Sequence, residues 1–234
     1  MIVFFDIDGT LVDYKFAERA GAIQYYNEHM GLFNFLEAEF IKLWGDLAYK
    51  YFNRYLNKEL TFDEQRRSRM KALFKTVGIE LSDLEAESEF STYESFYRDN
   101  WKAFDDVIPC LNQLKDVQLG VISNGDYKHQ IDKLKRVGLV DYFLTVVTSG
   151  EVGYSKPDKR IFIEACKKLG KTPEQCNYVG DDLTIDISGS NAAGLKGIWL
   201  NRKQENAEQK NIVSIEDLYK LPNLLYTLHL KHSL

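Results

Sequence analysis

The sequence predicts an α/β protein whose mainly parallel sheet is interrupted, after the first strand, by a block of helices. An apolar run at Ile2–Phe5 has the length and composition of a buried strand. From about residue 16 to residue 104, apolar residues recur at helical spacing without a convincing strand, whereas strand-like and helix-like segments alternate from Asp105 onward. Because parallel strands need crossover helices, the first strand belongs with the alternating half, and the helical block is an insert.

The insert is expected to contain four helices. Two of them begin with a capping-box pattern, because Thr61 and Ser82 are each followed three residues later by a glutamate that can bond back to the cap. Its many aromatic residues are expected mostly to form a bundle core. An arginine cluster at residues 66, 67 and 69 is expected to lie on a solvated helix face or to face a ligand. The expected helices lie at about 16–30, 36–56, from 61 onward and 82–101.

The second half is expected to supply the remaining strands and the helices that cover both faces of the sheet. The predicted α/β core domain comprises residues 1–13 and 104–234, and the helical domain comprises residues 14–103. Helices are expected at 109–115, 127–137, 158–169, 185–193 and 214–228, and strands at 117–122, 144–148, 177–179 and 197–200.

Composition excludes several classes of protein. The 30 basic and 35 acidic residues give a net charge of -5, which argues against general binding to nucleic-acid polymers or membrane surfaces. The three cysteines lack metal-ligand spacing and are expected to be reduced core thiols of a cytoplasmic protein. The segment Met1–Phe5 has no basic region, and no apolar run is long enough for a membrane helix. A monomer and a homodimer both remain open.

The first candidate site follows the first strand. Asp6 and Asp8 stand one residue apart, and Gly9 then lets the chain turn. Two carboxylates held this close repel each other unless a cation or a proton intervenes, and hard oxygen ligands favour Mg2+. A solvated turn after a strand remains the alternative for this motif taken alone.

Two further polar motifs follow strands or precede helices in the second half. The sequence Ser123-Asn124-Gly125 combines a hydroxyl with backbone N–H groups at a helix start, an arrangement that can bind an anion. Lys156, just ahead of a predicted helix, could neutralise a phosphate or an aspartate. An ordinary strand-to-helix connection and a solvated lysine are the alternatives.

A second acidic cluster follows the predicted strand at 177–179. Asp181 and Asp182 follow Gly180, and Asp186 comes four residues after Asp182. These carboxylates would repel one another without a metal, so they are a candidate second half of a magnesium site. The alternative is a helix N-terminus that favours acidic residues, which explains Asp182 better than Asp181.

Taken in order, the motifs Asp-x-Asp-Gly-Thr, Ser-Asn-Gly, Lys-Pro-Asp and Gly-Asp-Asp with a further aspartate resemble the signature of the haloacid dehalogenase-like hydrolase superfamily. The helical insert resembles that superfamily's C1-type cap. Residues 152–158 and 60–66 look closest to the pyrimidine and broad-range 5'-nucleotidase branch. The resemblance implies a Rossmann-like three-layer core with an inserted all-helical cap domain.

The resemblance also implies an activity and residue roles. The implied activity is that of a Mg2+-dependent phosphomonoesterase acting through an aspartyl-phosphate on a small phosphorylated metabolite, with a nucleoside 5'-monophosphate as the first expectation. Asp6 would be the nucleophile and Asp8 the acid/base. The implied metal ligands are Asp6, the carbonyl of Asp8 and Asp181, with Asp186 in support, and the implied phosphate-binding groups are Ser123, Asn124, Lys156 and Thr10.

Other activities of the same fold are kept as alternatives. Dehalogenases of this fold lack an aspartate at the position of Asp8, so its presence favours phosphate chemistry. A sugar-phosphate or phosphoglycolate-type phosphatase or a phosphomutase remains an alternative. A non-catalytic phosphoacceptor or phosphate-binding module is a more remote one, because receiver domains have no large helical insert after the first strand. Candidate specificity residues are Tyr14, Phe16, Trp44 and Arg69.

Overall fold

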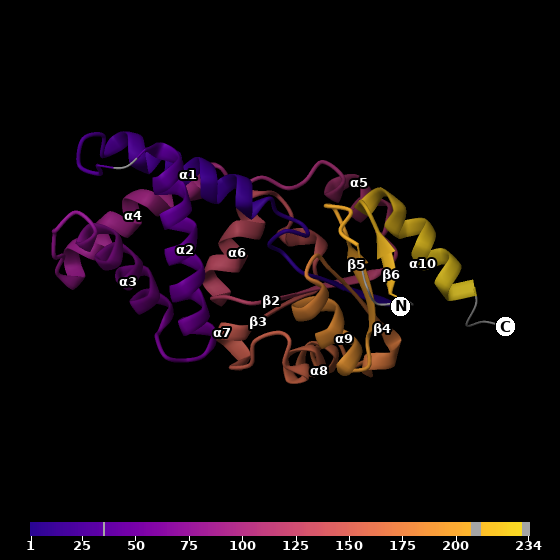
Figure 1. The fold of residues 1–234 in the computed structure, drawn as a ribbon. Helices are drawn as coiled ribbons and strands as arrows, with labels where there is room; N and C mark the ends of the chain where they lie inside the picture. The colour runs from indigo at the N-terminus through magenta and orange to yellow at the C-terminus, as the bar shows by residue number, and fades with distance from the viewer. Residues whose placement is uncertain (35, 207–211, 231–234) are drawn as a thin grey trace. The chain divides into compact units, whose positions relative to one another are not determined.

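The computed structural model describes residues 1–34, 36–206 and 212–230. The chain forms two compact units, one made of Met1–Asp13 with Ala103–Leu234 and the other of Tyr14–Lys102 (Figure 1). The first unit contains a parallel sheet, and the described residues of the second unit form helices joined by turns and loops, with no strand. The prediction of an α/β fold with an inserted helical cap is therefore confirmed.

The sheet of the first unit has six parallel strands within the described residues, in the order β3-β2-β1-β4-β5-β6. The first strand of the chain lies inside the sheet, where Phe5 pairs with Val121 on one side and with Val179 on the other. The carboxyl ends of these three strands therefore meet at one edge. The strands are β1 (Ile2–Phe5), β2 (Gln118–Ser123), β3 (Thr145–Thr148), β4 (Cys176–Gly180), β5 (Lys196–Leu200) and β6 (Val213–Ile215).

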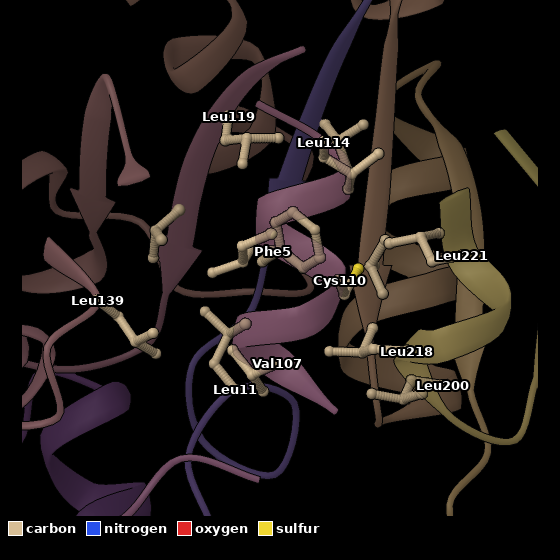
Figure 2. Packing of buried hydrophobic residues seen from close by; sticks show 14 of the residues in the cluster. Phe5, Leu11, Val107, Cys110, Leu114, Leu119, Leu139, Leu200, Leu218 and Leu221 are labelled. Carbon is tan, nitrogen blue, oxygen red and sulfur yellow. The ribbon is translucent and has the colours of Figure 1, made fainter. Parts of the chain in front are cut away.

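Helices cover both faces of this sheet, as the alternation of β1 side chains requires. Val3 and Phe5 belong to a core shared with α5, α6 and α10 (Figure 2), whereas Ile2 and Phe4 belong to a separate core shared with α8. The helices of this unit are α5 (Val107–Gln113), α6 (Tyr127–Arg136), α7 (Ser149–Val152), α8 (Lys159–Lys168), α9 (Gly189–Ala192) and α10 (Leu221–Leu230).

The second unit is a bundle of α1 (Tyr14–Glu28), α2 (Glu37–Leu56), α3 (Phe62–Lys75) and α4 (Asp83–Asp99). Both predicted capping boxes are present at the starts of α3 and α4. The core is aromatic, as predicted: the rings of Trp44 and Tyr93 lie 4.2 Å apart. Arg69 is only 8% exposed and lies over the Trp44 ring, so it is not on a solvated helix face.

Three segments differ from the sequence predictions. The C-terminal helix begins at Leu221 rather than 214, because Val213–Ile215 adds β6 beside β5; this strand buries only Ile215 and has too short a pattern to recognise. The predicted helix at 185–193 is a π-helical segment at Leu183–Ser188 that leads into α9. It begins early because Asp182 accepts hydrogen bonds from the backbone N–H groups of Thr184 and Ile185. The short helix α7 was not predicted.

The three cysteines are unpaired and buried, as predicted for core thiols. Among the described residues, the helices are all too short or too polar to cross a membrane.

Candidate active site

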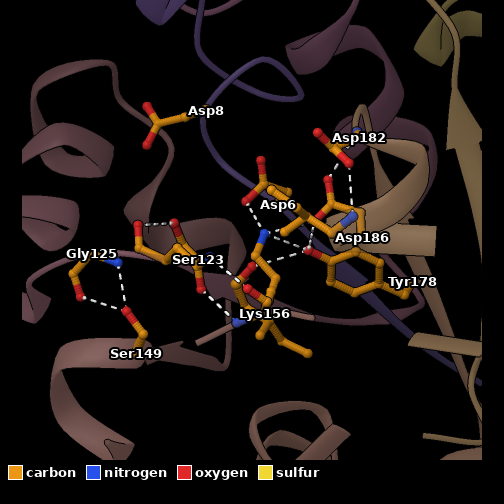
Figure 3. A network of polar contacts seen from close by, with 12 residues as sticks. Asp6, Asp8, Ser123, Gly125, Ser149, Lys156, Tyr178, Asp182 and Asp186 are labelled. Atoms are coloured by element: carbon orange, nitrogen blue, oxygen red, sulfur yellow. Dashed lines mark hydrogen bonds and ion pairs between the residues drawn. The ribbon is translucent and has the colours of Figure 1, made fainter. Parts of the chain in front are cut away.

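The first acidic motif emerges from the middle of the sheet and turns at once. The Asp6 amide donates to the Val179 carbonyl at 2.9 Å, so Asp6 still has the extended geometry of β1 and is only 5% exposed. Gly9 has a φ of +92°, and a Cβ there would lie 2.4 Å from the Asp181 carboxylate, so no other residue fits. The turn therefore separates Asp6 from Asp8, and the two carboxylates have different surroundings (Figure 3).

Asp6 belongs to a buried cluster centred on Lys156. The Lys156 ammonium donates to Asp6 Oδ1 at 2.6 Å, to Asp186 Oδ1 at 2.7 Å and to the Tyr178 hydroxyl oxygen at 2.9 Å. The Asn124 side chain holds the Lys156 backbone, accepting from its N–H at 2.7 Å and donating to its carbonyl at 3.1 Å. The Ser-Asn-Gly motif after β2 and the Lys156 motif after α7 are thus joined by two hydrogen bonds.

Three carboxylates of this region can share a cation. One oxygen from each of Asp6, Asp181 and Asp186 can be chosen so that all lie within 4.8 Å of one another. Gly180 makes this possible, because a Cβ at that position would lie 2.4 Å from Asp186 Cγ. Burial raises the pKa of Asp6 well above its ordinary value; Lys156 opposes this shift and the neighbouring carboxylates add to it.

This donor set fits a hard divalent cation. With the carboxylates ionised, these three groups and the single lysine ammonium carry a formal charge of about two negative units. Mg2+ prefers oxygen ligands and commonly uses one or two carboxylates together with substrate phosphate. The site thus has the ligand chemistry and the uncompensated charge that a magnesium ion requires.

The Asp8 carboxylate is paired with a different ammonium group, that of Lys133. Lys133 donates to Asp8 Oδ1 at 2.5 Å, and Gln130 Nε2 donates to Asp8 Oδ2 at 2.9 Å. Both donors come from α6, where a spacing of three residues places them on one face. Burial raises the pKa of Asp8, but the Lys133 charge and the hydrogen bonds from Gln130 and Lys133 outweigh it and hold the pKa below its ordinary value.

The predicted phosphate-binding residues are only partly brought together. Ser123 is 1% exposed, and its Oγ accepts from Gln130 Nε2 at 2.9 Å. Ser123, Asn124 and Lys156 thus surround the ends of β1 and β2. Thr10 is fully buried; its hydroxyl has no hydrogen-bond partner among the described residues, and its carbonyl accepts from Arg202 at 2.9 Å.

Sequence reasoning missed Lys133, Gln130 and Tyr178. A weak signal existed for the first two, because polar residues at positions three apart share a helix face, and this helix directly follows Ser-Asn-Gly. The sequence also contained an indication of Tyr178. Side chains two residues apart on a strand share a face, so Tyr178 lies on the same face as Gly180, where the missing side chain leaves room for Asp186.

Comparisons with known proteins define the class. Residues 1–194 match the family model of the haloacid dehalogenase-like hydrolases, so the chain belongs to that family. It is 33% identical to the glyceraldehyde 3-phosphate phosphatase of Methanothermobacter thermautotrophicus, over 95% of this chain and 98% of the relative. It is 31% identical to human N-acylneuraminate-9-phosphatase, over 99% of this chain and 96% of the relative.

A solved structure gives the same fold. The magnesium-bound HAD-hydrolase YfnB of Bacillus subtilis superimposes with a TM-score of 0.78 at 24% identity, covering 96% of this chain and 98% of that one. The predicted superfamily is confirmed by the family match. The two named phosphatase relatives do not support the predicted nucleotidase branch.

Proposed function

We propose that this protein is a Mg2+-dependent phosphomonoesterase that acts on a small sugar-phosphate-like metabolite through an aspartyl-phosphate. The observation that carries the proposal is the separation of two neighbouring carboxylates. Asp6 lies buried beside Lys156 within a group of three carboxylates, whereas Asp8 is held outside that group by residues of α6. Such a separation suits one carboxylate to attack phosphorus and the other to transfer protons.

In the first step, an Asp6 carboxylate oxygen attacks the phosphorus of the ester. The bond between phosphorus and the leaving oxygen breaks with its electron pair on that oxygen, which takes a proton from the Asp8 carboxyl group. Asp8 takes up this proton when the ester binds, because the negative charge of the phosphate opposes the lowering of its pKa by Lys133. The products are the free alcohol, the Asp8 carboxylate and a phosphoryl group bound to Asp6.

In the second step, the Asp8 carboxylate takes a proton from a water molecule whose oxygen attacks the same phosphorus. The bond between phosphorus and Asp6 breaks, which regenerates the Asp6 carboxylate and releases inorganic phosphate. Asp8 is then protonated and ready for the next cycle.

Other residues bind the transferring group and the metal. We assign the phosphoryl oxygens to Ser123 Oγ, the Asn124 N–H and the Lys156 ammonium, which supply the fixed donors that phosphoryl transfer requires. Thr10 supports the turn. Asp6, Asp181, the carbonyl of Asp8 and, in support, Asp186 would hold Mg2+, which neutralises phosphoryl charge when bound. Residues 1–13 and 104–234 are assigned to the catalytic domain and residues 14–103 to the cap domain.

The substrate class follows the named relatives rather than the first sequence expectation. One relative is named for a triose phosphate and the other for a sialic acid phosphate, both phosphate esters of sugars or sugar acids. These names support the sugar-phosphate alternative better than a nucleoside 5'-monophosphate. The Asp8 carboxyl suits both classes of ester, because each loses an alkoxide that needs a proton.

The test is phosphate release with and without Mg2+ from glyceraldehyde 3-phosphate, N-acylneuraminate 9-phosphate and a nucleoside 5'-monophosphate. We expect Mg2+-dependent release that is fastest for a sugar phosphate and abolished by Asp6→Asn. The matched control is Asp141→Asn, since Asp141 is exposed. Normal turnover by a folded Asp6→Asn protein would refute the mechanism. A stable phosphoprotein formed from acetyl phosphate, without ester turnover, would favour the non-catalytic alternative.

A further inference from the structure

Helix α6 carries two polar side chains that the reaction scheme above does not use. Lys133 and Gln130 are each only 2% exposed. A lysine is rarely buried unless it is paired, because removing its charge from water is costly. Both side chains meet the carboxylate of Asp8, which remains 27% exposed.

The two donors hold the Asp8 carboxylate at both of its oxygens. Lys133 bonds Oδ1 at 2.5 Å and Gln130 bonds Oδ2 at 2.9 Å. A single hydrogen bond would leave the carboxylate free to rotate about its terminal bond, whereas two donors from a rigid helix fix its plane. The ion pair alone would neutralise the charge, so the second donor adds orientation.

Gln130 also connects Asp8 to the loop that follows β2. The same Nε2 lies 2.9 Å from Ser123 Oγ and 3.3 Å from the Asn124 carbonyl oxygen. The buried Gln130 amide therefore links the Asp8 carboxylate to Ser123 and Asn124, two of the residues assigned to phosphate binding. A shift of α6 would therefore displace the Asp8 carboxylate relative to the loop after β2.

We propose that Lys133 and Gln130 are positioning residues that orient the Asp8 carboxyl group for proton transfer to the leaving-group oxygen. This inference rests on the proposed phosphatase function. A purely structural ion pair would have the same contacts, but it predicts a different kinetic result. Orientation of the acid affects mainly the substrates whose leaving group needs a proton.

The test compares two substrates. p-Nitrophenolate is a stable anion and leaves without a proton, whereas the alkoxide of glyceraldehyde 3-phosphate must be protonated. For Lys133→Met and Gln130→Met, we expect kcat/KM for the alkyl phosphate to fall by about 100-fold, the lower end of what general acid catalysis contributes. The value for p-nitrophenyl phosphate should fall by roughly tenfold at most, because the acid is not needed for that departure. Lys133→Arg should restore most of the alkyl phosphate activity.

Asp8 also acts as the base in the second step, which gives a second readout. Poor orientation of Asp8 slows hydrolysis of the phosphoenzyme for every substrate. Lys133→Met should therefore release p-nitrophenolate in a burst of about one equivalent per active site, followed by a slow steady state. The matched control is Lys135→Met on the exposed side of the same helix, which should behave as wild type in both assays.

Equal losses for both substrates and no burst would show a structural role and overturn the inference. If Lys133→Met does not fold, Gln130→Met must still show the selective loss, and its absence would equally refute the proposal. Wild-type protein that releases phosphate from neither substrate would mean that the proposed function itself has failed. That result is distinct, because it appears before any substitution is made.

Discussion

Two polar clusters lie at the carboxyl edge of the sheet, and their charges differ. The first cluster, Asp6, Lys156, Tyr178, Asp181 and Asp186, contains three carboxylates and one ammonium group. The second cluster, Asp8, Lys133, Gln130 and Ser123, contains one of each. The first cluster therefore carries uncompensated negative charge that can bind a cation, whereas the charges of the second cluster already cancel. Two aspartates of one short motif are prepared for different roles by what surrounds them.

The largest expected effect comes from removing the single cation of the first cluster. Lys156→Met leaves Asp6 and Asp186 buried without their ammonium partner, so the free energy of unfolding should fall by about 3–5 kcal/mol. Urea unfolding in EDTA measures this change. Lys159→Met, at an exposed position in the first turn of the adjacent helix, is the control. An unchanged midpoint for Lys156→Met would mean that the carboxylates do not depend on this lysine.

The second-largest expected effect is the stabilisation by Mg2+, which should depend on the carboxylates of the first cluster and not on the Asp8 carboxylate. Wild-type protein at a Mg2+ concentration 100 times its dissociation constant should gain about 2.7 kcal/mol of stability. Asp181→Asn removes a proposed ligand and should lose most of that gain at the same concentration. Asp8→Asn keeps the backbone carbonyl and should retain the gain. The measurement is the shift in melting temperature on adding Mg2+, and an equal response from both variants would contradict the separate roles.

The sequence was sufficient for the first five strands of the sheet and for the order of the motifs. Ile2–Phe5 and the strands that flank it are apolar runs ended by charged or small residues, and parallel strands bring such ends to one edge. The same reasoning predicted two halves of a magnesium site, Asp6 with Asp8 and the later cluster at Asp181, Asp182 and Asp186. The structure brings Asp6, Asp181 and Asp186 together and places the Asp8 carboxylate elsewhere. These residues were accessible because each directly follows, or lies close after, a strand.

The partners of Asp8 were not accessible in this way. Lys133 and Gln130 lie inside a helix, where sequence shows only the face they share and not what that face meets. Whether a helical lysine is solvated or buried depends on the distance between α6 and the turn after β1, which is set by the packing of Leu134 and Phe5 in the core. Tertiary geometry of this kind has no local signature. Edge strand β6 was missed because three residues carry too little periodicity.

A smaller effect is expected at Tyr178. Tyr178→Phe removes a buried hydroxyl that accepts from Lys156 and lies 2.9 Å from Asp186 Oδ1. Loss of these bonds should cost about 1–3 kcal/mol of stability and weaken Mg2+ binding by about tenfold, because the hydroxyl orients a supporting carboxylate. Urea unfolding and a Mg2+ titration of activity measure the two effects. Phe162→Leu, which alters the ring that packs on Tyr178, controls for packing and should leave Mg2+ affinity unchanged.

The effects of pH should have opposite signs in the two clusters. The pKa of Asp8 lies below its ordinary value of 3.8, so its stabilising contribution is complete above about pH 4 and is lost as the pH falls through the folded pKa. The pKa of Asp6 is raised in the metal-free protein, so its contribution is present below about pH 4 and is lost as the pH rises through the folded pKa.

At pH 7 in EDTA, Asp6→Asn should therefore be more stable than wild type and Asp8→Asn less stable, each by on the order of 1 kcal/mol per unit of pKa shift. Towards acidic pH, both differences should shrink. Urea unfolding of the three proteins across a pH series measures them. Differences of the same sign for the two variants at pH 7 would show that the two aspartates share one electrostatic environment, and the contrast between the clusters would then be wrong.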